Sequence, residues 1–173
     1  MAEKRTGVIT FKKKPMTLLG PDIDVGSQAP DFEVVDSDLK SVTRDSAKGK
    51  IQLITVVPSI DTEICDIMTR QFNKDVSVLP KDRVVVYTIS VDLPFAQKRW
   101  CVNADVQRTQ LLSDYKERSF GLNYGLLIDE LKFLARAVYV IDATGKVAYR
   151  EIVPEITDEP NYSAALNAVK ALL

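Results

Sequence analysis

The segment with the clearest chemical potential is Pro58–Cys65, which reads PSIDTEIC. It follows the apolar run Ile51–Val57 and precedes apolar residues that recur at helical spacing. Asp61 and Thr62 are both favoured residues for capping a helix N-terminus, and either places Cys65 in the first helical turn. Free backbone N–H groups and the positive end of the helix dipole favour a thiolate there, and the thiolate is the nucleophilic form of cysteine. The alternative is a buried cysteine that packs only as a small hydrophobic residue.

Composition restricts the chemistry open to this cysteine. The 173 residues include no histidine, which excludes Ser-His and Cys-His catalytic pairs and the commonest transition-metal ligand. Two cysteines, Cys65 and Cys101, are too few for a disulfide scaffold or for a structural zinc or iron–sulfur site. A net charge of −1 argues against nucleic acid as the main partner. Because the basic N-terminal residues are not followed by the apolar segment of a signal peptide, we expect a cytoplasmic protein.

Two apolar, β-branched runs, Ile51–Val57 and Val84–Ser90, predict buried strands at the centre of a sheet. Apolar residues at helical spacing between them predict a helix, which makes a right-handed βαβ unit with parallel strands. The other predicted elements are a hairpin formed by Val8–Phe11 and Met16–Leu19, a short strand at Phe32–Val35, a short helix from Pro94 to Arg99, a hairpin formed by Ala137–Ile141 and Val147–Glu151, and a final helix at Tyr162–Leu173. Together they predict an α/β fold with a central mixed β-sheet flanked by helices, in one domain over residues 1–173.

Pro58, Thr62 and Cys65 fit the pattern Pro-x-x-x-Thr-x-x-Cys, which is the active-site signature of the peroxiredoxins. Further segments resemble the bacterial thiol peroxidases, an atypical two-cysteine subfamily of the peroxiredoxins. These segments are Asp92–Gln97, Arg99–Cys101, Leu134–Val138, the Thr10-Phe11 hairpin and the approach to the last helix from Glu155 to Tyr162. The resemblance covers nearly the whole chain and implies a thioredoxin-like fold with an N-terminal β-hairpin extension at residues 7–20.

The resemblance also implies individual roles around Cys65. Cys65 is expected to be the peroxidatic cysteine, whose thiolate attacks a hydroperoxide and becomes a sulfenic acid while water or an alcohol leaves. Arg136 is expected to stabilise the thiolate and orient the peroxide with its fixed guanidinium donors. The Thr62 hydroxyl is expected to approach both the sulfur and a peroxide oxygen, and Pro58 to shield the sulfur. The alternatives are that Thr62 is only a helix cap and that Arg136 is a strand-edge arginine paired with a carboxylate.

Cys101 is implied as the resolving cysteine, which attacks the sulfenic acid and forms an intramolecular disulfide with Cys65. The alternative is an inert thiol packed beside Trp100. A disulfide requires Cα atoms within about 7 Å, whereas the two cysteines lie on separate predicted helices with a strand between them. We therefore expect the segments around both cysteines to shift or locally unwind on oxidation. Arg70 does not have the i+3 or i+4 spacing of a helix neighbour of Cys65, and we interpret it as a surface residue.

The activity implied by the resemblance is a thiol-specific peroxidase that reduces hydrogen peroxide and organic (alkyl or lipid) hydroperoxides. We expect an apolar pocket wall from the first-turn neighbours of Cys65, from Phe95 and from the Phe120–Leu127 region, because apolar contact favours organic hydroperoxides. The family implies thioredoxin as the reductant, a homodimer, and no metal, haem or flavin. Neither nucleic acid nor a membrane is an expected partner.

Two other functions begin from a reactive Cys65. A thioredoxin-like dithiol oxidoreductase would need a Cys-x-x-Cys pair, which the sequence lacks. A non-enzymatic redox sensor would also form a sulfenic acid at Cys65. A sensor would be oxidised once and stop, whereas a peroxidase would cycle in the presence of a reductant.

Overall fold

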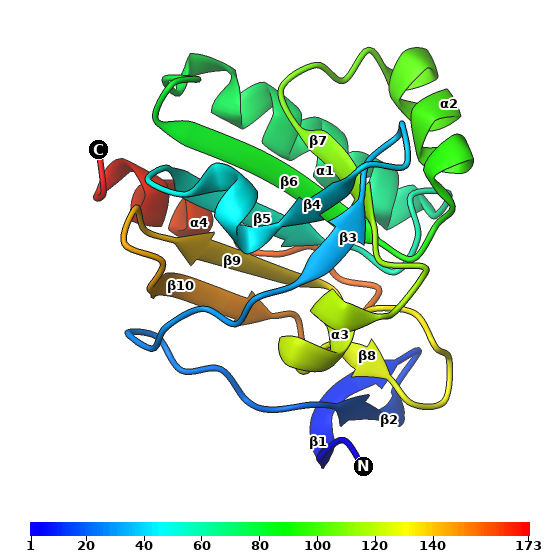
Figure 1. Cartoon of the computed structure of the whole chain (residues 1–173). Coiled ribbons are helices and arrows are strands. Elements are labelled where there is room, and N and C mark those ends of the chain that lie inside the picture. Colours follow the sequence, from blue (N-terminus) through cyan, green and yellow to red (C-terminus); the bar gives the residue numbers. More distant parts are fainter.

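The computed structural model describes residues 1–173 and has at its centre strand β5 (Ile51–Val56), in which every residue is buried (Figure 1). β5 pairs in parallel with β6 (Val84–Ser90) and antiparallel with β9 (Ala137–Ile141). A strand that is covered on both faces cannot alternate polar and apolar residues, which is why β5 and β6 are continuous β-branched runs. The prediction of two buried parallel strands at the centre of the sheet is confirmed.

The complete sheet has seven strands in the order β10-β9-β5-β6-β7-β3-β4. β5, β6 and β7 run parallel, and the remaining pairings are antiparallel, so the sheet is mixed, as predicted. The predicted hairpin of β9 and β10 is confirmed. The outer strands are β10 (Val147–Ile152), β7 (Gln110–Ser113), β3 (Glu33–Val35) and β4 (Ser41–Thr43).

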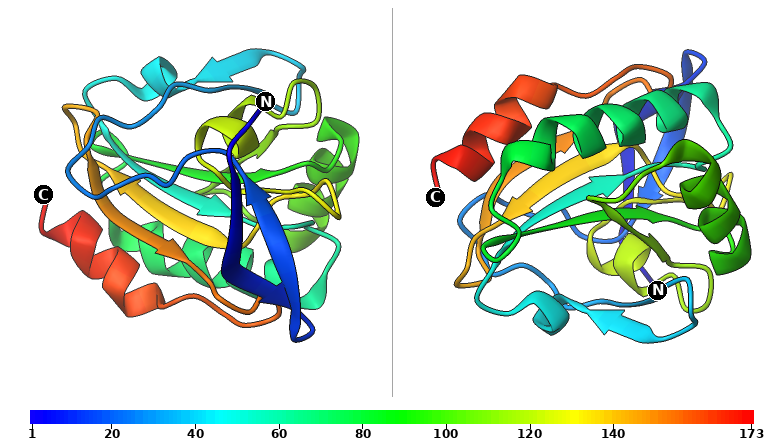
Figure 2. Two further views of the ribbon diagram at one scale, coloured as in Figure 1. Left: turned by 90° about the horizontal axis from the view of Figure 1, so that it is seen from below. Right: turned by 90° about the horizontal axis from the view of Figure 1, so that it is seen from above.

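Helices α1 (Glu63–Asp75) and α4 (Tyr162–Lys170) lie together on one face of this sheet (Figure 2). Cys65, Met68 and Phe72 of α1 form one apolar cluster with Ala165 and Val169 of α4. The remaining helices are α2 (Pro94–Ala104), α3 (Ser119–Asn123) and two 3-10 turns, η1 (Arg44–Ala47) and η2 (Val76–Val78). α2 begins at its proline as predicted but continues beyond the predicted end at Arg99. None of the helices is both long and apolar enough to cross a membrane.

The predicted N-terminal hairpin is present and lies on the side of the sheet opposite to α1 and α4 (Figure 2). Its strands β1 (Lys4–Phe11) and β2 (Lys14–Leu19) join β8 (Leu127–Ile128) in a separate three-stranded sheet. Lys12 and Lys13 form its turn in the left-handed conformation, with φ of 50° and 65°. That backbone twist matches the twist of the flanking strands.

The base of the hairpin lies against backbone atoms at a point where no side chain fits. Gly125 has a φ of +62°, and a Cβ atom added there would lie 2.0 Å from the carbonyl oxygen of Pro21. Arg5 of β1 donates a hydrogen bond to the Gly125 carbonyl oxygen, which joins the hairpin to the loop before β8. Close backbone contact at Gly125 therefore helps to place the hairpin on the body of the protein.

We expect Gly125→Ala to lower the free energy of unfolding by roughly 3 kcal/mol or more, because the added Cβ must displace backbone atoms. Gly7→Ala is the matched control, since Gly7 has a φ of +74° but nothing within 4 Å of an added Cβ. In that variant the free energy of unfolding should fall by only about 1–2 kcal/mol, which is the cost of a left-handed backbone conformation for alanine. Urea unfolding measures both values, and equal losses would contradict the prediction.

Candidate active site

Cys65 lies in the first turn of α1, at the carboxyl end of central strand β5. Pro58 has no N–H to donate to a strand ladder, so the chain leaves the sheet there. Thr62 is the N-cap residue of α1 with extended backbone angles, and its carbonyl oxygen accepts the Asp66 N–H. The Cys65 side chain is fully buried, and its thiol is free. The predicted position of this cysteine is confirmed.

Arg136 reaches the Cys65 sulfur from the residue just before β9, and only 2% of it is exposed. Its Nη2 donates to Cys65 Sγ over 3.4 Å, and its Nη1 donates to Met68 Sδ over 3.5 Å. Its Nε donates to the Ile156 carbonyl oxygen over 2.9 Å. No carboxylate forms an ion pair with this guanidinium. The alternative of a strand-edge arginine paired with a carboxylate is therefore excluded.

The environment of Arg136 has an electrostatic consequence for Cys65. A buried cation is costly unless a nearby group compensates its charge. Of the three groups that Arg136 contacts, the Cys65 sulfur is the one that can become an anion, because the others are a thioether and a carbonyl oxygen. A thiolate at Cys65 would compensate this buried charge, and the thiolate is the nucleophilic form of the side chain.

A small cavity of about 150 Å³ lies next to this pair. Pro58, Thr62 and Arg136 all border it, so the structure brings these predicted site residues together. The apolar part of its wall consists of Phe11, Ile64, Phe133 and Ile156. An apolar cavity of roughly this volume holds a benzene-sized group. Since Arg136 borders the cavity and also contacts Cys65, a molecule in the cavity would lie beside the reactive pair.

The hydroxyl of Thr62 has a different partner from the expected one. Its Oγ1 donates to the Ser59 carbonyl oxygen over 3.2 Å, and no hydrogen bond joins it to Cys65. The side chain accepts no helix N–H either, so Thr62 caps α1 through its backbone alone. Thr62 is therefore placed at the cavity, while an approach of its hydroxyl to the sulfur stays a prediction.

The prediction for the pocket wall is wrong except for the first-turn neighbours of Cys65. Phe95 is 66% exposed on α2, whereas Phe120 is fully buried in the core on the other side of the sheet. Phe11 and Phe133 line the cavity instead, with ring centroids 6.5 Å apart in an edge-to-face arrangement. Apolar residue type alone does not separate core positions from cavity positions. The available signal was the position of Phe133, three residues before Arg136.

Sequence reasoning also missed Asp92, which holds the loop that precedes α1. Its carboxylate accepts hydrogen bonds from Ser59 Oγ, from the Ile60 N–H and from Ser90 Oγ, each over 2.7 Å. Asp92 lies between the end of β6 and the start of α2. The aspartate therefore ties the loop on the Cys65 side to the segment that leads to Cys101.

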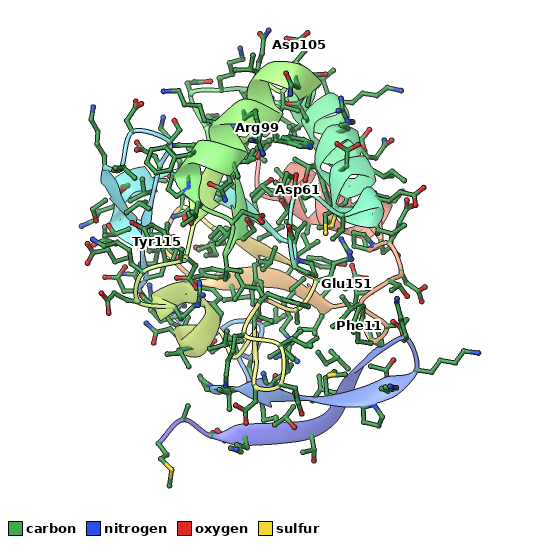
Figure 3. The ribbon with its side chains drawn as sticks, turned by 90° about the vertical axis from the view of Figure 1, so that its right-hand side faces the viewer. Phe11, Asp61, Arg99, Asp105, Tyr115 and Glu151 are labelled. Carbon is green, nitrogen blue, oxygen red and sulfur yellow. The ribbon has the colours of Figure 1, made fainter.

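Cys101 lies on α2, partly exposed and also free. Burial raises the pKa of its thiol, which disfavours the thiolate form in this arrangement. The two cysteines belong to separate helices with β6 between them in the chain, as predicted. Figure 3 shows α1 and α2 side by side, with Asp61 between them and Phe11 on the hairpin side.

A bridge of side chains joins the neighbours of the two cysteines. Trp100 Nε1 donates to Asp66 Oδ1 over 2.8 Å, and Arg70 Nε donates to Asp66 Oδ2 over 2.9 Å. The Arg70 guanidinium also lies 5.4 Å from the centre of the Trp100 ring and donates to the Ala104 carbonyl oxygen. Arg70 is exposed, as predicted, but its interpretation as a mere surface residue is wrong because it connects α1 to α2. No three His, Cys, Asp or Glu side chains are grouped as a metal site would require.

Comparison with known proteins identifies the family. The Redoxin family model matches residues 24–166. The thiol peroxidase of Halalkalibacterium halodurans is 54% identical over 165 residues, which cover 95% of this chain and 98% of that protein. The thiol peroxidase of Listeria monocytogenes serovar 1/2a is 51% identical over 162 residues, covering 94% and 97%. The crystal structure of a peroxiredoxin-like protein from Aquifex aeolicus superposes with a TM-score of 0.90 at 44% identity and covers 98% of both chains. The fold is thioredoxin-like, as predicted.

We expect Arg136→Gln, made in a Cys101→Ser background, to slow the alkylation of Cys65 by iodoacetamide at least about tenfold. The reason is that a hydrogen bond to a charged group contributes roughly 1.5–3 kcal/mol. Arg136→Lys keeps a charge but loses the planar arrangement of donors. Its alkylation rate should therefore lie between those of the protein with Arg136 and of the Arg136→Gln variant. Arg150→Gln is the control, since Arg150 pairs with Asp22 on the surface. An unchanged alkylation rate in a folded Arg136→Gln variant would contradict the electrostatic argument.

Proposed function

The chain belongs to the redoxin family and is a thiol peroxidase of the peroxiredoxin type, and on that premise we propose that Cys65 and Cys101 together reduce hydrogen peroxide and organic hydroperoxides. The observation that carries the proposal is the Arg136 guanidinium, which is buried without a carboxylate partner, contacts Cys65 Sγ and borders the cavity. A single group thus reaches both the nucleophile and the space in which a peroxide would bind.

In the first step, the Cys65 thiolate attacks one peroxide oxygen and the O–O bond breaks. The sulfur loses two electrons and becomes a sulfenic acid, while the other oxygen leaves, after protonation, as water or an alcohol. Negative charge moves from sulfur to the leaving oxygen, so donors that are already in place lower the barrier. Arg136 supplies such donors, and Pro58 shields the sulfur from bulk water. Thr62 borders the cavity and would supply another donor once its hydroxyl turns away from the Ser59 carbonyl oxygen.

In the second step, the Cys101 thiolate attacks the Cys65 sulfenic sulfur and a disulfide forms, while the sulfenic oxygen leaves as hydroxide and becomes water after protonation by solvent. The present arrangement supports peroxide attack and opposes this step, because Cys101 is partly buried on a different helix and its thiol pKa is raised. The bridge of Asp66, Arg70 and Trp100 holds the two helices in place. Resolution therefore requires the bridge to open and the segments around both cysteines to move.

Reduction of the disulfide completes the cycle. We assign this step to thioredoxin, whose thiolate attacks one sulfur and forms a mixed disulfide that its second thiolate then releases. Each turnover thereby delivers two electrons to one hydroperoxide. A homodimer, which rests on the family resemblance, and a cytoplasmic location complete the proposal.

The cavity wall supports a preference among substrates. Phe11, Ile64, Phe133 and Ile156 offer apolar surface to the organic group of a hydroperoxide. Burial of apolar surface contributes about 25 cal/mol per Å², and hydrogen peroxide has no such group to bury. An organic hydroperoxide such as cumene hydroperoxide should therefore have the higher kcat/KM.

Oxidation of the reduced protein with one equivalent of cumene hydroperoxide tests the assignment of the cysteines. We expect intact mass and thiol counts to show the loss of two thiols and two hydrogens, with the bond mapped to Cys65–Cys101. The Cys101→Ser variant should instead gain oxygen at Cys65, and Cys65→Ser should not react. One lost thiol in the wild type would exclude Cys101 as the resolving cysteine. Oxidation without turnover in the presence of thioredoxin and its reductase would indicate a sensor.

Trp100 is the only tryptophan of the chain, so its fluorescence reports on the bridge directly. We expect peroxide to change this fluorescence at the rate of disulfide formation, because resolution separates Trp100 from Asp66. Stopped-flow measurement would show the change in the wild type and not in Cys101→Ser, which forms the sulfenic acid alone. A mapped disulfide that forms with no change in fluorescence would overturn the expected movement.

A further inference from the structure

Part of the cavity wall is formed by Phe11, which belongs to the N-terminal hairpin and not to the central sheet. Phe11 is the last residue of β1, at the tip of the hairpin, and it faces Phe133 across the edge-to-face contact. The central strands that place Cys65 and Arg136 do not hold this tip. The position of Phe11 therefore depends on whatever fixes the tip of the hairpin to the body of the protein.

Glu155, which follows β10, is the residue whose side chain binds the tip. Its carboxylate accepts hydrogen bonds from Thr10 Oγ1 over 2.6 Å and from the N–H groups of Lys12 and Lys13 over 3.0 Å each. The donors are therefore the residue just before Phe11 and the two residues just after it. Hydrogen bonds from the Thr10 hydroxyl, the Lys13 N–H and Thr157 lower the pKa of Glu155 to about 2, so the carboxylate is charged near neutral pH.

The same segment also reaches the reactive centre. The backbone of Thr10 exchanges hydrogen bonds with Pro154 and Ile156, at 2.7 and 2.9 Å. The Ile156 carbonyl oxygen accepts the bond from Arg136 Nε, and its side chain borders the cavity. Glu155 thus binds the hairpin turn with its side chain, while the next residue along the chain, Ile156, binds Arg136 with its backbone.

We propose that Glu155 is a positioning residue for substrate selection, which holds Phe11 against the cavity and thereby sets the preference for organic hydroperoxides over hydrogen peroxide. This inference rests on the proposed function and adds to it a residue that touches neither sulfur nor peroxide. A loosened hairpin tip would lose apolar contact with the organic group. Hydrogen peroxide needs only Cys65 and the groups around it, so its reduction should be almost unaffected.

The chain provides a matched control in Glu130. Both of its carboxylate oxygens accept the N–H of Thr17 in the second strand of the hairpin, over 3.1 and 3.0 Å. Backbone hydrogen bonds from the hairpin lower the pKa of Glu130, as such bonds help to do for Glu155. Glu130 does not border the cavity. The two glutamates therefore differ chiefly in whether they hold the part of the hairpin that carries Phe11.

The test compares Glu155→Gln and Glu155→Ala with Glu130→Ala, with dithiothreitol as reductant so that the result does not depend on thioredoxin. For Glu155→Ala we expect kcat/KM for cumene hydroperoxide to fall about tenfold, chiefly through KM, as lost uniform binding predicts. The value for hydrogen peroxide should stay within about twofold. Glu155→Gln should have a kcat/KM for cumene hydroperoxide between those of the wild type and Glu155→Ala. Glu130→Ala should leave the ratio of the two kcat/KM values unchanged.

A double-mutant cycle with Phe11→Ala identifies the route. If Glu155 acts through Phe11, the loss in the double variant should equal that in Phe11→Ala alone, because effects that share one contact are not additive. Equal losses for both peroxides in Glu155→Ala would overturn the proposal and point to an effect through Ile156 on Arg136. Unchanged kinetics in both Glu155 variants would also overturn it. A wild-type protein that reduces neither peroxide would refute the proposed function itself.

Discussion

The buried charge of Arg136 is the constraint on which the site depends. Its guanidinium is held by a backbone carbonyl oxygen, a thioether and the Cys65 sulfur, with no carboxylate to neutralise it. A carboxylate in this place would satisfy the arginine and leave no electrostatic reason for an anionic sulfur. The fold therefore keeps a cation where burial is costly, and the sulfur opposite it is the one contact that could carry a compensating negative charge.

The surrounding loops hold this arrangement, and the proposed disulfide formation would have to release part of it. Asp92 binds the loop before α1 with three short hydrogen bonds, while Asp66 receives one donor from each of the two cysteine-bearing helices. The second set is partly exposed, with Asp66 and Arg70 side chains accessible over 35% and 47% of their surface. Exposed ion pairs contribute little to stability. The opening that we propose for disulfide formation would thus break the weaker of the two sets of contacts.

The sequence predicts the centre of the fold better than its edges. Continuous β-branched runs identify β5 and β6, and the motif around Cys65 identifies the first turn of α1. The short strands β4 and β7 carry too few residues for a period to be visible. The spacing of Arg70 along its own helix gives no sign of its aromatic partner Trp100, which lies on α2. Phe11 and Phe133 meet only in three dimensions, so their shared wall has no signature in a single sequence.

The separation between the reactive pair and the aromatic wall has a consequence for how such proteins diversify. Cys65 and Arg136 are placed by strands β5 and β9 of the main sheet and by helix α1, whereas Phe11 belongs to a hairpin in a different sheet. Substitutions in the hairpin can therefore alter one wall of the cavity without disturbing the buried strands. Ile64 and Phe133 of the same wall lie close in the sequence to Cys65 and Arg136, so the hairpin is the part of the wall that is free to evolve at a different rate from the chemistry.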